Sequence, residues 1–347
     1  MTQFIGVEDM RRLVRSTGTK AFLTHLAGYV RSDFSRWREF EKSARVASHS
    51  RDGVIELMPT SDGQLYSFKY VNGHPSNPLT GKLTVTAFGV LADVKSGYPL
   101  LISEMTLLTA LRTAATSAFA ASVLARSDSK SMALIGAGAQ SEFQALAFQA
   151  IIGITEIRVY DPDPLAVDKF MTNAAGFGLK LIRSASAEDA VAGADIATVC
   201  TAVKGRQALI NAAMLSPGTH INAIGGDCPG KTELDRDILA VGKYFTEFTP
   251  QTRIEGEIQQ AAADYPVAEL WEVLAGAKDG RTSAQDITVF DSVGFAIEDF
   301  SALRLVHDLT ADKRKLVDLV PDLADPKNLY GELIGGSIVV KKVPELV

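Results

Sequence analysis

The fold is decided by Met132-Ala133-Leu134-Ile135-Gly136-Ala137-Gly138-Ala139-Gln140-Ser141. The four apolar residues predict a buried strand. The two glycines after it fit a tight turn whose backbone approaches a pyrophosphate. Ser141 stands where a third glycine is usual, and its small side chain still allows close packing of helix against strand. The stretch therefore predicts a dinucleotide-binding unit of the Rossmann type.

A carboxylate closes the next predicted strand. Asp161 follows Ile157-Arg158-Val159-Tyr160, about where an acidic side chain binds the ribose hydroxyl groups of a dinucleotide. A carboxylate there repels a 2′-phosphate, so we expect NAD rather than NADP. The simpler alternative is a glycine-rich turn beside a solvated Asp. The order of strand, turn, helix and second strand favours the cofactor site.

Predicted strands and helices alternate from Met132 onward. This alternation is typical of βαβ units and predicts a mostly parallel, doubly wound sheet. Residues 1–100 instead mix two predicted helices, 7–14 and 19–34, with alternating strands. A long Ala- and Leu-rich helix follows at 103–125, with Ser103 as its expected cap. The predicted strands of the alternating part are 131–135, 156–160, 179–183, 195–201, 220–224, 244–248 and 287–290.

We therefore predict an α/β protein of two domains. A Rossmann NAD-binding domain is placed at residues 116–310, and an α+β domain at residues 1–115 together with the tail 311–347. The tail is expected to return to the first domain after a last helix, predicted from Gly294 to Leu309.

Composition restricts the possible partners. The chain has 347 residues, a net charge of −6 and a pI of about 5.5, which argues against a nucleic-acid ligand. Two cysteines without a CxxC motif and five scattered histidines predict neither a disulfide nor a metal site. The N-terminus lacks the pattern of a signal peptide, and we see no apolar run of about 18 residues. We expect a cytoplasmic protein that does not contact membranes.

A second informative segment is Gly225-Gly226-Asp227-Cys228-Pro229-Gly230-Lys231-Thr232-Glu233-Leu234, directly after an apolar run. Its glycines allow the backbone to approach a flat ligand, and Asp227 falls just past a predicted strand, where α/β sheets bind ligands. Asp227 and Lys231 form an ionisable pair. An ordinary strand-to-helix loop with a solvated Asp is the alternative.

Charged residues also interrupt apolar stretches upstream. Arg45, Lys69 and Arg112 each have apolar or small neighbours, and Glu56 lies within Val54-Ile55-Glu56-Leu57-Met58. Taken singly, each is more simply a charge that points out of a strand or helix. Taken together, three cations can clamp one carboxylate. Glu56 would then suit the amino end of an amino acid.

The chain resembles the ornithine cyclodeaminase/mu-crystallin family over nearly its whole length. The resemblance rests on residues 84–93, 103–113, 225–231, 250–257 and 290–295. The Gly-Gly-Asp-Cys-Pro-Gly-Lys segment is the most specific, because mu-crystallin-like members differ in this loop. Ala137 departs from the family, where we expect a more polar residue that points into the phosphate turn.

The resemblance implies a homodimer with a split substrate-binding and dimerisation domain and one Rossmann domain that holds NAD tightly. It assigns substrate binding to Arg45, Lys69 and Val293, with Arg112 able to serve both substrate and cofactor, and catalysis to Asp227. The expected cofactor contacts, which include the two glycines of the turn, are Thr84, Arg112, Gly136, Gly138, Ala139, Gln140, Asp161, Thr201, Ile221, Asn222, Ala223, Ile224, Lys231 and Ser292.

The implied reaction is that of an ammonia-lyase, which converts L-ornithine to L-proline and ammonia without net redox change. It would proceed by hydride abstraction, intramolecular cyclisation, ammonia loss and hydride return. Asp227 would act as general acid and base, and Glu56, the second catalytic residue, would bind the δ-amine and could take its proton. Lysine or 2,4-diaminobutyrate remain alternative substrates, because one methylene is worth only about 1–3 kcal/mol. An amino-acid dehydrogenase, a cyclic-imine reductase and a non-catalytic binding protein remain alternative functions.

Overall fold

The alternating part of the chain forms an eight-stranded sheet in which every neighbouring pair is parallel. The computed structural model describes residues 1–202, 205–311 and 315–334. The strand order of the sheet is β15-β14-β16-β12-β10-β7-β8-β9. Its strands are β7 (Ser131–Ile135), β8 (Glu156–Tyr160), β9 (Lys180–Arg183), β10 (Ile196–Val199), β12 (His220–Ala223), β14 (Gly242–Thr246), β15 (Val267–Glu269) and β16 (Ile287–Asp291).

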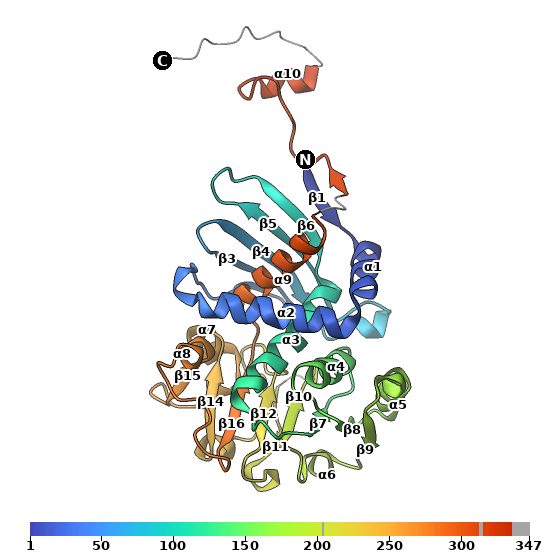
Figure 1. The fold of residues 1–347 in the computed structure, drawn as a ribbon, viewed down its shortest axis with the longest axis vertical. Helices are drawn as coiled ribbons and strands as arrows, with labels where there is room; N and C mark the ends of the chain where they lie inside the picture. The colour runs from blue at the N-terminus through green and yellow to red at the C-terminus, as the bar shows by residue number, and fades with distance from the viewer. Residues whose placement is uncertain (203–204, 312–314, 335–347) are drawn as a thin grey trace.

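The predicted parallel, doubly wound sheet is confirmed. The strand order reverses between β7 and β10, which creates the crevice where such sheets bind ligands. Within this sheet one strand was not predicted: β15, whose three residues carry too little periodicity to recognise. The short strands β11 (Arg206–Ile210) and β13 (Thr232–Leu234), which pair with each other in a separate two-stranded sheet, were not predicted either. The sheet is flanked by α4 (Ser141–Ile151), α5 (Pro164–Ala174), α6 (Ala187–Val191), α7 (Thr249–Glu255) and α8 (Leu270–Leu274), with α5 beside the edge strand β9 (Figure 1).

The first part of the chain forms a mixed seven-stranded sheet of order β17-β1-β6-β5-β4-β3-β2. Only β1 and β6 run parallel, and the other neighbours are antiparallel. The tail returns to this sheet, since β17 pairs with β1; residues 312–314 and 335–347 lie outside the described part. The strands are β1 (Thr2–Ile5), β2 (Val46–His49), β3 (Val54–Ser61), β4 (Leu65–Gly73), β5 (Val85–Asp93), β6 (Pro99–Glu104) and β17 (Leu316–Val317).

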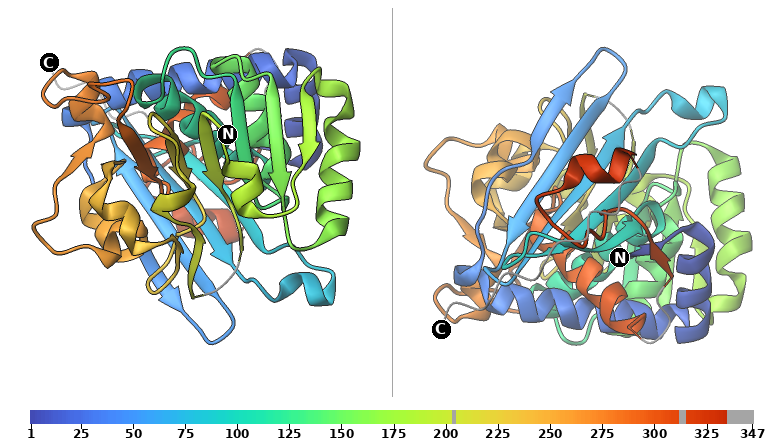
Figure 2. Two further views of the ribbon diagram at one scale, coloured as in Figure 1. Left: turned by 90° about the horizontal axis from the view of Figure 1, so that it is seen from below. Right: turned by 90° about the horizontal axis from the view of Figure 1, so that it is seen from above.

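Long helices join the two sheets. Helix α2 (Thr19–Ser35) and helix α3 (Thr106–Leu124) lie between them in Figure 1, and both views in Figure 2 show α2 along one side of the molecule. Helix α9 (Ala296–Leu309) packs on β3, β4 and β5 of the seven-stranded sheet, although our sequence boundary grouped it with the Rossmann part. Two further helices, α1 (Val7–Thr17) and α10 (Leu329–Ile334), lie near the N-terminus of the chain in Figure 1.

Helix α3 differs from the sequence prediction in two ways. It begins at Thr106 rather than Ser103, because Ser103 and Glu104 end strand β6; Glu104, not Ser103, accepts a hydrogen bond from the Leu107 N–H, at 2.7 Å. Its 19 residues are also apolar enough to cross a membrane, contrary to our reading of the sequence. Two-thirds of its most apolar window (67%) is buried within the protein, as in a core helix.

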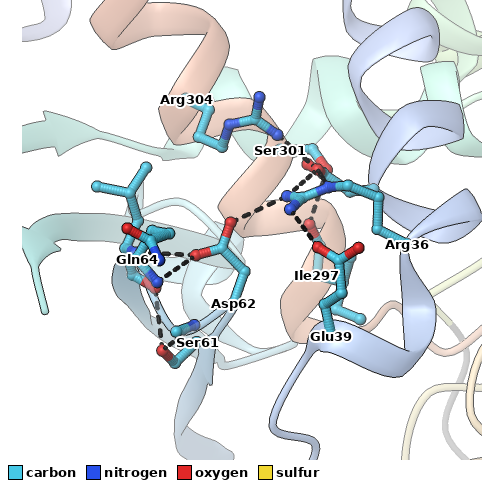
Figure 3. A network of polar contacts seen from close by, with 11 residues as sticks. Arg36, Glu39, Ser61, Asp62, Gln64, Ile297, Ser301 and Arg304 are labelled. Atoms are coloured by element: carbon cyan, nitrogen blue, oxygen red, sulfur yellow. Dashed lines mark hydrogen bonds and ion pairs between the residues drawn. The ribbon is translucent and has the colours of Figure 1, made fainter.

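A polar network holds α9 against α2 and the β3–β4 turn (Figure 3). Arg36, which follows α2, contacts Asp62 at 3.0 Å and the fully buried Asp33 at 2.8 Å. Asp33 also accepts hydrogen bonds from Ser301, at 2.7 Å, and from Arg304, both on α9. The network fixes the position of α9 along the sheet, and the same helix carries two carboxylates of the site described next.

Candidate active site

The glycine turn has the geometry that its sequence predicted. Gly136 has φ +103°, and a Cβ there would lie 2.8 Å from the carbonyl oxygen of Cys200, so only glycine fits. The Ala137 N–H donates to Asp161 at 2.8 Å, which fixes the end of β8 against the turn. Ala137 is fully buried, so our expectation that it points into the phosphate turn is wrong.

The space around this turn fits a dinucleotide. Gly138 and Ala139 are exposed, and a Cβ at Gly138 would meet nothing within 4 Å, so the turn is open to a ligand. A cavity of about 400 Å³ lies beside Asp161, at the carboxyl end of β8. Its lining is Tyr160, Asp161, Pro162, Pro164, Val167, Arg183, Ser184 and Ala185. The turn suits a pyrophosphate, and the cavity with its carboxylate suits the adenosine end.

The Asp227 loop meets the turn across the crevice. Lys231 Nζ donates to the carbonyl oxygen of Thr201, just past β10, at 3.2 Å and to Asp227 Oδ1 at 3.3 Å. Burial lowers the pKa of Lys231, but the carboxylates of Asp227 and Glu233 outweigh it and raise the pKa overall. The Asp227 side chain is 55% exposed, whereas that of Lys231 is 9% exposed. The Lys231 ammonium is therefore a buried positive charge that contacts the accessible Asp227 carboxylate.

The two glycines of this loop serve a purpose that the sequence did not reveal. A Cβ at Gly225 would lie 1.8 Å from Glu233 Oε2, and one at Gly226 would lie 2.8 Å from Glu257 Oε1. Both glutamates are buried, and Glu233 donates its backbone N–H to Glu257 at 2.8 Å. We had attributed these glycines to the approach of a flat ligand. In the structure they make room for buried carboxylates that support the loop.

Two of the three predicted cations share one carboxylate. Lys69 Nζ, on β4, lies 2.9 Å from Asp299 Oδ1, and Arg112 Nε, on α3, lies 3.0 Å from the same oxygen. Arg112 Nη1 also contacts Glu298 at 2.5 Å. All four residues are buried. Burial and the neighbouring Arg112 lower the pKa of Lys69 to about 8, while Asp299 opposes the shift.

Arg45 contacts a different set of protein groups. Its Nη1 contacts Glu56 at 3.0 Å, its Nε lies 3.1 Å from Glu255, and its Nη2 donates to the carbonyl oxygens of Val293 and Gly294. The three predicted cations therefore have different protein partners, although Arg45 is close enough for its charge to lower the pKa of Lys69. Lys69 and Arg112 form one group, and Arg45 with two glutamates forms another.

Residues beyond the strand ends connect these groups. Ser292, after β16, donates to the buried Glu247, which also accepts the Gly294 N–H at 3.2 Å. The charge of Asp227 is close enough to act on both Arg45 and Glu255. The site therefore runs along the carboxyl ends of five parallel strands, from the turn after β7 past β10, β12 and β14 to β16.

The other predicted cofactor residues have the following environments. Thr84 lies directly before β5, where its carbonyl oxygen accepts the His74 N–H at 2.8 Å. Ile221 and Ala223 point into the core of the eight-stranded sheet, and the Ile224 N–H continues the strand by donating to Val199 at 3.1 Å. The Asn222 side chain is buried without a hydrogen-bond partner in the described structure. Gln140 precedes α4 at the turn.

Five buried carboxylates of this site had no predicted role: Glu233, Glu247, Glu255, Glu298 and Asp299. A signal existed for two of them, because Glu298-Asp299 interrupts the apolar start of α9. The other three looked like ordinary loop or strand-end acids. Among residues 1–202, 205–311 and 315–334, no three His, Cys, Asp or Glu side chains are grouped to hold a metal ion.

Comparisons with known proteins agree with this architecture. The ornithine cyclodeaminase of Agrobacterium fabrum (strain C58) is 61% identical over 333 residues, which cover 95% of this chain and 94% of the relative. An archaeal alanine dehydrogenase dimer with bound NAD has a TM-score of 0.84 at 31% identity, covering 92% of this chain and 99% of the other. A lysine cyclodeaminase, solved to explain recognition of L-lysine, L-ornithine and L-2,4-diaminobutyric acid, has a TM-score of 0.86 at 28% identity, covering 94% and 98%.

The parallel sheet, the glycine turn and the charged group at the strand ends define a dinucleotide-binding protein with a site for a small charged ligand. A model of the ornithine cyclodeaminase/mu-crystallin family matches residues 7–314. The chain belongs to this family.

Proposed function

We propose that this protein is an NAD-dependent ornithine cyclodeaminase that converts L-ornithine to L-proline and ammonia without net redox change. The observation that carries the proposal is the pattern of charges at the strand ends beside the dinucleotide turn. Lys69 and Arg112 supply cations at one place, and Glu56 and Asp227 supply carboxylates at another. A diamino acid has the complementary charges. The 61% identity to the Agrobacterium fabrum ornithine cyclodeaminase supports the same reaction.

We assign the parts of the reaction to the chain's own residues. Lys69 and Arg112 bind the α-carboxylate, and their Asp299 partner holds both cations in place. Asp227, which is exposed and anchored by Lys231, takes and returns the proton at the α-nitrogen. Glu56, fixed by Arg45, binds the δ-ammonium. NAD, when bound, supplies a reversible hydride acceptor, which leaves the protein to orient the substrate and exclude water.

The reaction is tested by incubating the enzyme with L-ornithine and NAD⁺ at far below the substrate concentration. We expect proline and ammonia in equal amounts, with many turnovers per NAD⁺ and no accumulation of NADH. NADH formed in proportion to product would instead identify a dehydrogenase. L-Lysine and L-2,4-diaminobutyrate each differ from ornithine by one methylene. Parallel incubations with these two amino acids therefore show which side-chain length the enzyme prefers.

Cofactor selectivity should depend on Asp161. We expect the wild-type enzyme to prefer NAD⁺ to NADP⁺, and Asp161→Ser to weaken NAD⁺ binding and reduce this preference roughly 10-fold or more, because the carboxylate that repels a 2′-phosphate is removed. Fluorescence titration with both cofactors measures the change. Since Asp161 also accepts the Ala137 N–H, Asp161→Asn is the control that keeps an acceptor at the turn. A wild-type preference for NADP⁺ would contradict this assignment.

We also propose that the protein is a homodimer. Val46, Leu57, Tyr70 and Phe88 lie opposite one another in neighbouring strands, so they form a row on one face of the seven-stranded sheet. Helix α9 covers the other face. In the single chain Val46 is 64% exposed and Phe88 44%, and such apolar rows mark protein–protein contacts. A second copy of the chain would cover this face.

A further inference from the structure

One segment of the site, residues 249–257, has no role in the mechanism above. It forms α7 and the turn after it. Gln251 accepts the Arg45 N–H at 3.1 Å and donates to Gly294 at 2.9 Å. Glu257 accepts the backbone N–H groups of Glu233 and Leu234 at 2.8 and 3.1 Å. Gln251 and Glu257 thus bind backbone groups of neighbouring segments. Because Glu255 lies between them in the sequence, these contacts fix its position.

Glu255 faces the site with an unused buried oxygen. The residue is 7% exposed, and its Oε2 lies 3.1 Å from Arg45 Nε. The two groups are not aligned for a hydrogen bond, so Oε2 has no hydrogen-bond donor in the described structure. A buried carboxylate oxygen without a donor is costly, and a bound cation with N–H groups would satisfy it.

The charges around Glu255 also favour a cation. Glu56 and Glu255 contact neighbouring nitrogens of the single Arg45 guanidinium, at 3.0 and 3.1 Å. The half-buried thiol of Cys228 and the carboxylate of Asp227 lie within range of the same group. Two carboxylates on one guanidinium leave one negative charge uncompensated, whereas the charge of Asp227 is balanced by its own partner, Lys231. One ammonium group would restore the balance.

The same surroundings make Glu255 a proton acceptor near neutral pH. Burial raises its pKa to about 7; Arg45 lowers the pKa, and the carboxylates of Glu56 and Asp227 raise it. Glu255 is therefore largely ionised above pH 7 and able to take up a proton there. Below pH 7 it is already protonated, and it can then neither bind an ammonium tightly nor accept its proton.

We propose that Glu255 is a second carboxylate for the substrate's side-chain ammonium, that it acts with Glu56, and that it accepts the proton which makes this amine a nucleophile. The inference rests on the proposed function. The N–H bond of the ammonium breaks, and its proton moves to a carboxylate oxygen of Glu255. The freed lone pair forms the new N–Cα bond of the ring by adding to the α-imine that hydride abstraction leaves on the substrate, and the π electrons of the C=N bond move to the α-nitrogen. The α-amino group then leaves with the electron pair of its C–N bond, protonated by Asp227, as ammonia.

The test compares two reactions of Glu255→Gln. The first is cyclisation of L-ornithine with a trace of NAD⁺. The second is reduction of Δ¹-pyrroline-2-carboxylate by NADH, which involves no side-chain ammonium. Glu255→Gln should lower kcat/KM for ornithine roughly 10- to 100-fold, as for a lost charge-assisted bond, and leave imine reduction within about 3-fold. The wild-type loss of kcat/KM for ornithine below about pH 7 should weaken in the variant. Glu188→Gln, an exposed acid on α6, is the matched control.

The outcomes separate the two proposals. If the wild-type enzyme performs neither reaction, the proposed function fails. Suppose that the wild-type enzyme performs both reactions. If Glu255→Gln then loses cyclisation and imine reduction equally, Glu255 only holds Arg45 in place. If Glu255→Gln loses neither reaction, Glu255 has no part in the site. Both results overturn the inference. Should Glu255→Gln not fold, Glu255→Asp gives the answer, because the withdrawn carboxylate should lower ornithine cyclisation relative to imine reduction; an unchanged ratio overturns the inference.

Discussion

Asp227→Asn should lower kcat for ornithine by at least about 10²-fold, the effect of losing a general acid–base group. Asn keeps the shape of the side chain and can still accept a hydrogen bond from Lys231, but it cannot carry the proton. The fold should be unaffected, because the Asp227 side chain is 55% exposed and its one ion pair within the described residues, with Lys231, has a separation of 3.3 Å. Turnover of ornithine at saturating substrate, with NAD⁺ binding and melting temperature measured in parallel, tests this.

The matched control for this variant is Asp264→Asn, which changes an exposed carboxylate outside the site and should have wild-type turnover. Near-normal turnover in a folded Asp227→Asn protein that binds NAD⁺ would mean that another group moves the proton. Glu56 would then be the first candidate, since it lies in the same part of the site. A large fall in melting temperature would instead indicate a structural Asp.

The nucleotide-binding half could be predicted from the sequence because its signals are local. Strands β7 and β8 have the predicted bounds, and the Gly136 turn has the positive φ that its position requires. Spacing along the chain places Asp161 at the end of the strand after the turn, and no knowledge of distant contacts is needed. The parallel sheet follows from the same regular alternation.

The charged site could be predicted only in part, because its pairs join distant segments. Lys69 is 230 residues from Asp299, and Arg112 is 186 residues from Glu298. The sequence showed that these cations interrupt apolar stretches, but it could not show that one carboxylate joins two of them and that Arg45 contacts other carboxylates. The position of α9 on the seven-stranded sheet decides this, and the Asp33 network that fixes it also spans 268 residues, from Asp33 to Ser301.

Gly225 shows why even a correct motif can be misinterpreted. The sequence indicated that the backbone there needs glycine, which is right. The reason is Glu233, a residue eight positions later whose burial under the loop depends on the tertiary fold. A short motif therefore indicates that a side chain would not fit at a position, but it does not identify the neighbouring group that fills the space.

Lys69→Met should raise KM for ornithine roughly 10- to 150-fold, which corresponds to the about 1.5–3 kcal/mol of a lost charge-assisted hydrogen bond. NAD⁺ binding should change little. The free energy of unfolding should fall by about 1–3 kcal/mol, less than the about 3–5 kcal/mol of a fully broken buried pair, because Asp299 keeps Arg112 as a partner at 3.0 Å. Steady-state kinetics and denaturant unfolding measure the two effects.

The pH dependence of KM isolates the charge of Lys69 from its packing. Burial and Arg112 lower the pKa of this lysine to about 8, so the ammonium is charged below pH 8 and increasingly neutral above it. Only the charged form attracts a carboxylate, so KM for ornithine in the wild-type enzyme should rise above about pH 8. The titration of ornithine itself also changes KM, and it does so in both enzymes. Lys69→Met has no charge to lose at this position, so the additional rise of KM in the wild-type enzyme should be absent from the variant. The control Lys180→Met removes an exposed lysine and should keep the wild-type profile. Identical pH profiles in the wild type and Lys69→Met would place the carboxylate elsewhere, with Arg112 as the remaining cation of that group.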